Sequence, residues 1–196
     1  MIMTTRTAAA PPQGMSPALA VLRAFDALGA LAGIIAVLCL VTLLGLILLE
    51  VALGILGKLA PSMAGGLNFA WEYSAYLMGG VFLFGAAAGL RAGSHVRVTL
   101  LLSQARGGGL LALEVISTLI GLGVTGFMAW ALARFTIRAW TLGQMSSGSL
   151  TPLWIPDALL ATGAALLALQ FLARLLRLAL GLPTEDESLK AGSVAE

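Results

Sequence analysis

One stretch of the sequence, residues 73–90, limits the fold of this chain more than any other. Its 18 residues carry no charge and would extend about 27 Å as a helix, close to the thickness of the hydrocarbon part of a bilayer. A surface helix of a soluble protein keeps a polar side, whereas this stretch is apolar on every side. It follows Glu72 and precedes Arg91. We therefore interpret it as a membrane-spanning helix with a charge at each end.

The composition of the chain extends this interpretation to an integral membrane protein. Of the 196 residues, 59% are hydrophobic and 10% are charged, whereas an ordinary soluble domain has roughly 25% charged residues. The mean hydropathy is +0.99. The net charge of +2 is small and dispersed, so we expect no nucleic-acid partner, which would require clustered Lys and Arg.

Apolar stretches long enough to cross a bilayer occur four times, near residues 27–49, 70–90, 110–133 and 153–173. They predict an all-α integral membrane protein whose four transmembrane helices make one domain over residues 21–178. We expect residues 1–20 and 179–196 to be disordered tails, since neither contains an apolar core. The alternation of apolar and polar residues over 95–100 also predicts a short interfacial segment, which could be helical.

The basic residues predict how these helices are oriented. Four spans put both termini on one side, and that side holds eight Lys and Arg, namely Arg6, Arg23, Arg91, Arg97, Arg106, Arg174, Arg177 and Lys190. The other side holds three, namely Lys58, Arg134 and Arg138. Positive charge is concentrated on the cytoplasmic side of membrane proteins. We therefore expect both termini in the cytoplasm (N-in, C-in).

Charged side chains near the spans are the first candidates for function, because a charge inside a bilayer is costly. The acidic ones are Glu50, Glu72, Glu114 and Asp157, each within about two turns of a predicted interface. In one interpretation, each reaches the lipid headgroups or pairs with a nearby arginine. In the other, a partner protein is contacted near the outer face by Glu72, Asp157, Arg134 and Arg138. None of them lies where a proton relay across the membrane would need it.

The sequence offers no set of residues for catalysis or for holding a cofactor. His95 is the only histidine, whereas a haem between helices commonly takes two side-chain ligands and a His-based zinc site takes several. The single cysteine, Cys39, lies in an apolar stretch. We therefore expect no enzyme activity, no cofactor and no metal site, and we interpret His95 and Arg97 as polar groups at the membrane surface.

Small residues make the second apolar stretch unusually smooth. Gly85 and Gly89 have the spacing that lets two membrane helices approach closely, and the same stretch contains Gly79 and Gly80. These glycines predict helix packing. They do not decide between packing within the chain and packing against a second subunit.

Three motifs together resemble a known family. They are Trp71-Glu72 before the second span, Arg-x-Gly-x-His-x-Arg-Val from Arg91 after it, and Pro-Leu-Trp-Ile-Pro from Pro152 before the fourth. In this order they resemble the small membrane subunit of TRAP transporters, the tripartite ATP-independent periplasmic transporters of bacteria and archaea. The resemblance covers about residues 20–178. The chain departs from it at Thr99, where the family commonly has an aspartate, and lacks a second acid beside Glu72.

The resemblance implies partners and a role. In such systems a periplasmic substrate-binding protein captures an organic acid, and a large multi-span membrane subunit moves it by an elevator-type motion driven by a sodium gradient. The small subunit binds no substrate and packs against the static scaffold of the large one, in contact with the lipids of the bacterial inner membrane. The candidate interface or anchoring residues are then Glu72, Arg91, His95, Arg97, Arg134, Arg138 and Asp157.

Two other functions stay open at the level of sequence. One is a small self-contained exporter that works as a dimer, which would require Glu50 or Glu114 to lie deep among the helices. The other is a membrane anchor subunit of a redox enzyme, and the single histidine argues against it.

Overall fold

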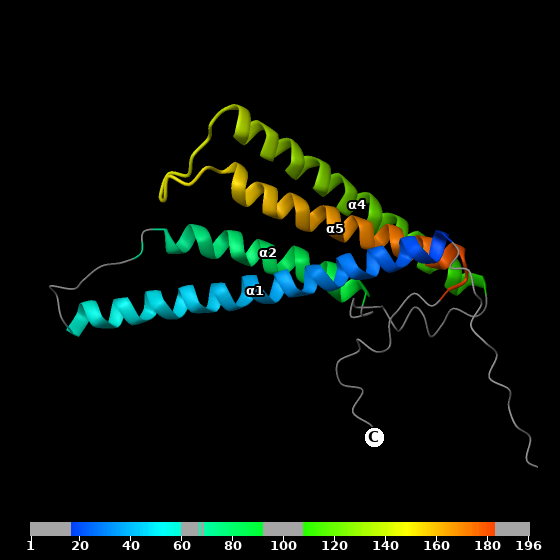
Figure 1. Ribbon diagram of the computed structural model, residues 1–196, viewed down its shortest axis with the longest axis horizontal. Coiled ribbons are helices and arrows are strands. Elements are labelled where there is room, and N and C mark those ends of the chain that lie inside the picture. Colours follow the sequence, from blue (N-terminus) through cyan, green and yellow to red (C-terminus); the bar gives the residue numbers. More distant parts are fainter. Residues whose placement is uncertain (1–16, 60–66, 68, 92–107, 183–196) are drawn as a thin grey trace, which may run out of the picture.

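The computed structural model describes residues 17–59, 67, 69–91 and 108–182, and these contain four α-helices (Figure 1). In chain order they are α1 (Pro17–Leu59), α2 (Ala70–Arg91), α4 (Gly108–Thr141) and α5 (Trp154–Ala179). Each is long and apolar enough to cross a membrane. The predicted all-α membrane fold with four transmembrane helices is confirmed, while the N-in, C-in orientation stays a prediction.

Some of the predicted features fall outside the described residues. These are the tails over residues 1–16 and 183–196 and the interfacial segment with His95 and Arg97, within residues 92–107. The helices also extend beyond the predicted spans. The largest extension is that of α1, whose 43 residues reach about 64 Å, twice the thickness of the hydrocarbon layer. Its last turns project past the start of α2 (Figure 1).

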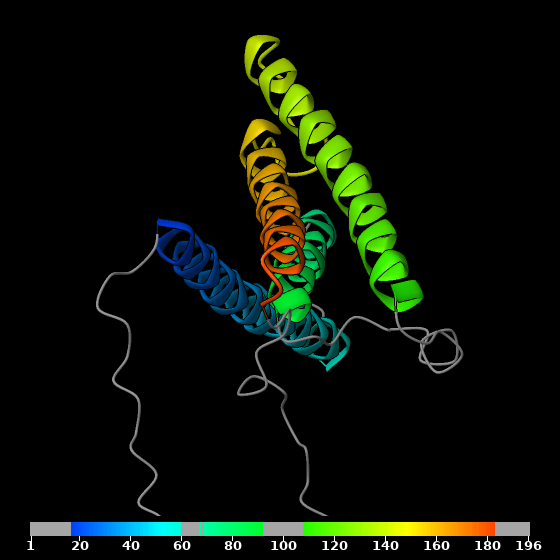
Figure 2. The same ribbon diagram turned by 90° about the vertical axis from the view of Figure 1, so that its right-hand side faces the viewer.

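The four helices form an open row in the order α1, α2, α5, α4 (Figure 2). α2 and α5 lie in the middle, and α1 and α4 form the two edges. We call one end of the row the termini end, where α1 and α4 begin and α2 and α5 stop, and the opposite end the loop end. Figure 1 shows the helices converging at the termini end, where α1 also contacts α5, and spreading apart toward the loop end.

Small residues bring the central helices together. A Cβ atom at Gly163 of α5 would lie 2.9 Å from the Cβ of Leu83 in α2, so a larger residue there would push the two helices apart. The ring of Phe84, which is 1% exposed, fills the adjoining space between α1, α2 and α5. On the other side of α5, the ring of Phe171 covers Gly121 of α4. Close approach through small residues is the usual way in which membrane helices pack.

The connection between α4 and α5 is a tight turn at the loop end. α4 ends at Thr141 and is followed by Gly143 at a φ of 59°. The N–H of Gln144 donates to the carbonyl of Ala139, as is usual where a glycine follows the end of a helix. The chain then folds back, with the N–H of Ser146 donating to the carbonyl of Thr151 at 2.8 Å. The turn thereby presents its serines toward the start of α2.

Candidate functional site

The Glu72 carboxylate is the centre of a polar cluster at the loop end. It lies in the first turn of α2, is 5% exposed, and accepts hydrogen bonds from three groups of the α4–α5 turn. The donors are the hydroxyl of Ser146, the hydroxyl of Ser149 at 2.7 Å and the N–H of Gly148 at 3.0 Å. Glu72 therefore joins α2 to the turn between α4 and α5.

Neighbouring contacts reinforce this connection. The hydroxyls of Tyr73 and Thr151 are hydrogen-bonded at 2.9 Å, and Thr151 also bonds Ser149 at 2.7 Å. Beyond the turn, the rings of Trp140 and Trp154 pack edge to face with centroids 4.7 Å apart. The loop end is thus held by polar contacts between α2 and the turn and by an aromatic contact between α4 and α5.

A second polar cluster lies at the termini end and joins three helices. Asp26 of α1 pairs with Arg177 of α5, and its Oδ1 lies 3.4 Å from Nε of Arg91 at the end of α2. Close by, the side chain of Gln170, which is 3% exposed, donates from Nε2 to the carbonyl of Phe25 at 2.6 Å. One carboxylate and one amide thus fix α1 against α5 where the helices converge.

The remaining ion pair at this end joins α4 to α5. Glu114 Oε1 and Arg174 Nη2 are 2.9 Å apart, with side chains 18% and 12% exposed. The sequence indicated that Glu114 could pair with a nearby arginine, and the structure identifies Arg174 as that arginine. Asp26 of α1 and Glu114 of α4 are therefore each paired with an arginine of α5 at the termini end.

Charges are absent from the middle of every described helix. The charge-free lengths lie between Glu72 and Arg91, between Glu114 and Arg134, and between Asp157 and Arg174, about 26 to 30 Å along each axis. In α1 the corresponding stretch is residues 27–49.

The buried hydroxyls between these charges are used within their own helix. Thr118 donates to the carbonyl of Glu114, and Thr125 to that of Gly121, both at 2.7 Å. In the part of the chain that the structure describes, no group of three His, Cys, Asp or Glu side chains could hold a metal ion. The middle of the row offers packing surfaces and no polar binding site among these residues.

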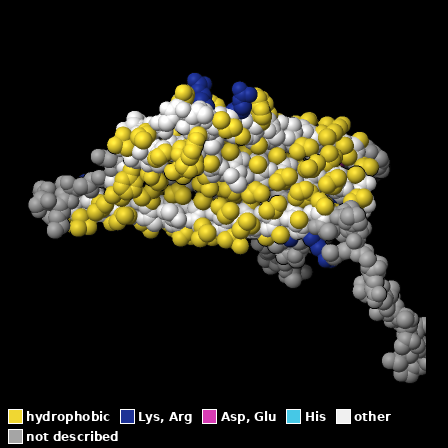
Figure 3. Space-filling view, turned by 45° about the horizontal axis from the view of Figure 1, so that its top comes forward, with side chains coloured by type: hydrophobic (Ala, Val, Ile, Leu, Met, Phe, Trp, Pro, Cys, Tyr) yellow, Lys and Arg dark blue, Asp and Glu magenta, His cyan; other side chains and the backbone are white. Residues whose placement is uncertain are grey.

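The basic residues Arg134 and Arg138 lie on the uncovered side of α4. Both side chains are exposed, and the guanidinium carbon of Arg134 is 5.2 Å from the centre of the Trp130 ring. Figure 3 shows basic side chains along the edge formed by α4, surrounded by apolar ones. Asp157 lies elsewhere, half-buried in the first turn of α5. One interpretation of the sequence grouped Arg134, Arg138 and Asp157 with Glu72 as a single contact to a partner protein. In the structure the two arginines lie on the exposed side of α4, whereas Asp157 lies at the start of α5 and Glu72 in its own polar cluster.

The predicted packing glycines lie against different neighbours. A Cβ at Gly79 would meet Leu160 of α5 at 2.8 Å, whereas one at Gly80 would meet Cys39 of α1 at 3.3 Å. Gly85 also faces α1, and Gly89 lines an open groove between α1 and α2. Packing within the chain therefore uses several of them, while contact with a second subunit stays a prediction.

Sequence reasoning missed the partners of the candidate charges. Ser146 and Ser149 lie more than 70 residues from Glu72 in the chain, and Asp26, which pairs with Arg177 and lies close to Arg91, was not among the candidate residues. The serine-rich turn over residues 146–149 was the available signal, because hydroxyls gathered between two spans are suited to binding a carboxylate. His95 and Arg97 lie outside the described residues.

Comparison with known protein families gave a match. The family described as "Tripartite ATP-independent periplasmic transporters, DctQ component" matches residues 51–181, which is two thirds of the chain and includes α2, α4, α5 and the whole Glu72 cluster. Searches of curated proteins and of solved structures gave no match. The chain belongs to the DctQ family and is the small membrane subunit of a TRAP transporter.

Proposed function

We propose that this chain is the scaffold subunit of a sodium-coupled importer of organic acids in the bacterial inner membrane. Its partners would be a large multi-span membrane subunit, which carries the substrate, and a periplasmic substrate-binding protein. The observation that supports this division of roles best is the position of the charges. They lie at the two ends of the described helices, with nothing charged between.

A carrier for an organic anion and Na⁺ needs polar groups at membrane depth. Carriers commonly bind substrate near the bilayer midplane, at broken helices or at charged side chains that face the interior. The helices described here are continuous, and their buried threonines bond to their own carbonyls. Substrate and ion binding would therefore fall to the large subunit.

The open row also supports a role in packing against another protein. α1 and α4 each have one side packed on a neighbour, and large apolar side chains are exposed on the other side. Val41 of α1 and Val124 of α4, for example, are each 62% exposed. We infer that the large subunit covers at least one of these edges, with lipid covering the remainder.

The exporter alternative loses support from the same geometry. It would require a carboxylate deep among the helices, whereas Glu114 pairs with Arg174 near the termini end and Glu50 is exposed on α1. The redox-anchor alternative would require a second haem ligand besides the single histidine, and the family is a transporter component.

Co-purification tests the scaffold role. The tagged chain is expressed together with the multi-span membrane protein and the binding protein encoded beside it, and we expect the multi-span protein to co-purify in detergent. In proteoliposomes the complete system should take up an organic acid in response to a sodium gradient, and the chain alone should not. If the chain never associates with a larger membrane protein, or transports alone, the proposal is wrong.

A pair of matched variants tests which edge is used. Val41→Trp and Val124→Trp add the same bulk at equally exposed positions on the two edges. We expect at least one of them to lower the yield of the complex while the isolated chain remains monodisperse. If neither variant changes the yield, docking through the edges of the row is contradicted.

A further inference from the structure

The exposed side of α4 carries a single stripe that changes from apolar to basic along its length. Ile120, Val124, Phe127, Ala131, Arg134 and Arg138 follow one another at intervals of three and four residues, so they lie on one face of the helix. The first three are 62%, 62% and 67% exposed. We call this set the α4 stripe.

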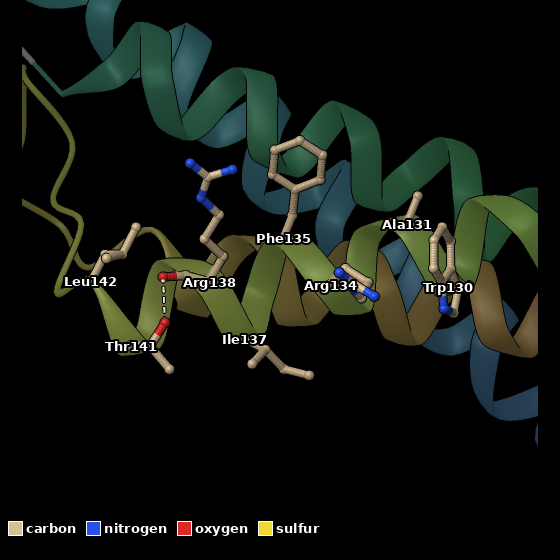
Figure 4. Close-up of a pocket in the computed structure, with 8 residues that line it drawn as sticks. All are labelled: Trp130, Ala131, Arg134, Phe135, Ile137, Arg138, Thr141 and Leu142. Atoms are coloured by element: carbon tan, nitrogen blue, oxygen red, sulfur yellow. Dashed lines mark hydrogen bonds between the residues drawn. The ribbon is translucent and has the colours of Figure 1, made fainter.

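The basic end of the stripe borders an open groove of about 670 Å³ on the surface of α4. Figure 4 shows the side chains around it, with Trp130 beside Arg134 and with Arg138 one turn further toward the loop end. The groove is lined by seven residues of α4 between Trp130 and Thr141 and by Leu142 just after the helix, and no other helix contributes to its lining. It is therefore a shallow surface that an elongated molecule could follow along the helix.

The depth of the two arginines matches that of lipid phosphates. Arg134 lies 20 residues after Glu114 in the same helix, which is about 30 Å and one hydrocarbon thickness. Glu114 pairs with Arg174 near the opposite end of α5. Arg134 and Arg138 would then reach the opposite interface, where Trp130 also belongs, since tryptophan favours the zone beneath the headgroups.

The apolar part of the stripe has the length of one acyl chain. From Ile120 to Ala131 the helix rises about 16 Å, roughly half of the hydrocarbon thickness. This part contains no polar member. A phosphate at the arginines would therefore place its own acyl chains along the exposed side chains of Val124 and Phe127.

The two guanidinium groups lack an anionic partner within the described residues. Neither Arg134 nor Arg138 has a carboxylate within ion-pair distance in residues 17–59, 69–91 and 108–182. Arginine presents several N–H donors in a plane that matches the oxygens of a phosphate. Two such groups one turn apart favour an anion in the leaflet at the loop end.

We propose that the α4 stripe binds one anionic phospholipid, with its phosphate on Arg134 and Arg138 and an acyl chain on the apolar residues. The stripe lies on the α4 edge, so a lipid bound here leaves the α1 edge for the proposed contact with the large subunit, and lipid binding does not itself require that contact. A lipid accounts for both halves of the stripe, because it joins an anion to a chain of half the bilayer thickness. An acidic segment of a protein would account only for the arginines.

Native mass spectrometry of the purified, delipidated full-length chain tests the proposal. Phosphatidylglycerol is the probe, and phosphatidylcholine is the zwitterionic comparison. We expect one phosphatidylglycerol to bind in preference to phosphatidylcholine. Arg134→Gln or Arg138→Gln should each weaken its binding by about fivefold, as expected for one basic residue near an anionic lipid surface.

Lys58→Gln is the matched control, because Lys58 is an exposed cation at the loop end of α1. It should change phosphatidylglycerol binding by less than about twofold. The proposal is overturned if the arginine variants bind phosphatidylglycerol as tightly as Lys58→Gln does. It is also overturned if they retain the lipid but lose the multi-span subunit in co-purification, because the stripe would then be a protein interface.

Discussion

Replacing Glu72 by glutamine should loosen the turn between α4 and α5 without unfolding the helices. Two hydroxyls, those of Ser146 and Ser149, donate to the same carboxylate oxygen, and the N–H of Gly148 donates to the other. An amide puts an NH₂ group opposite some of these donors and removes the charge from the remaining bonds. A hydrogen bond to a charged group contributes about 1.5–3 kcal/mol, and a neutral one about 1 kcal/mol.

The expected loss is therefore about 2–3 kcal/mol for two weakened bonds at a side chain that is 5% exposed. This corresponds to an increase of about 30- to 140-fold in the fraction of molecules with the turn open. Hydrogen exchange followed by mass spectrometry measures it directly. The N–H groups of Ser146 and Gly148 are hydrogen-bonded in the closed turn and should exchange faster by this factor.

Two further variants make the result specific. Glu50→Gln removes an exposed carboxylate from α1 and should leave exchange in the turn unchanged. Gly148→Ala keeps the charge, but its Cβ would lie 2.7 Å from Oε1 of Glu72, so it should open the same turn. If the turn exchanges at the wild-type rate in both Glu72→Gln and Gly148→Ala, Glu72 does not hold the turn, and the reasoning is refuted.

Three more predictions concern packing, the second ion pair and orientation. Gly163→Leu should destabilise the chain by about 1–3 kcal/mol in SDS-induced unfolding from detergent micelles, because Leu83 leaves no room, whereas Gly126→Leu, with open space around it, should not. A double-mutant cycle of Glu114→Gln and Arg174→Gln should give a coupling of about 1–2 kcal/mol, and a value of zero would contradict the pair. Green fluorescent protein at the C-terminus should fluoresce and alkaline phosphatase there should be inactive, and the reverse result would exclude a cytoplasmic C-terminus.

The number and approximate position of the helices could be predicted from sequence, but their arrangement could not. A charge-free length of one bilayer thickness, such as residues 73–90, is sufficient to locate a span. The same property keeps the sequence from predicting which helices are neighbours in the row, because a helix that is apolar on every side has no periodic apolar face to indicate its neighbour. Glycines were the best signal, and Gly79 and Gly80 point to different neighbours although they are adjacent.

The candidate charges were predictable, whereas most of their partners were not. Glu72 was identified because a carboxylate at the edge of a span is costly unless something compensates it. Its donors are serines in a turn more than 70 residues away, and nothing in their local sequence links them to Glu72. For Arg134 and Arg138, the sequence predicted position and charge, but only the fold shows that they continue the exposed stripe of α4.

The two polar clusters explain how a row of helices with exposed edges can keep one shape. In a bilayer, apolar helices gain little from leaving lipid for one another, so close packing and polar contacts determine which helices associate. The Asp26 cluster ties α1, α2 and α5 together at the termini end, where the helices converge. The Glu72 cluster ties α2 to the α4–α5 turn at the loop end, where the helices spread apart (Figure 1). Under the proposed scaffold role the chain stays fixed while its partner moves, which requires such ties at both ends. Loosening either one should then lower transport by the complex without changing which substrate it prefers.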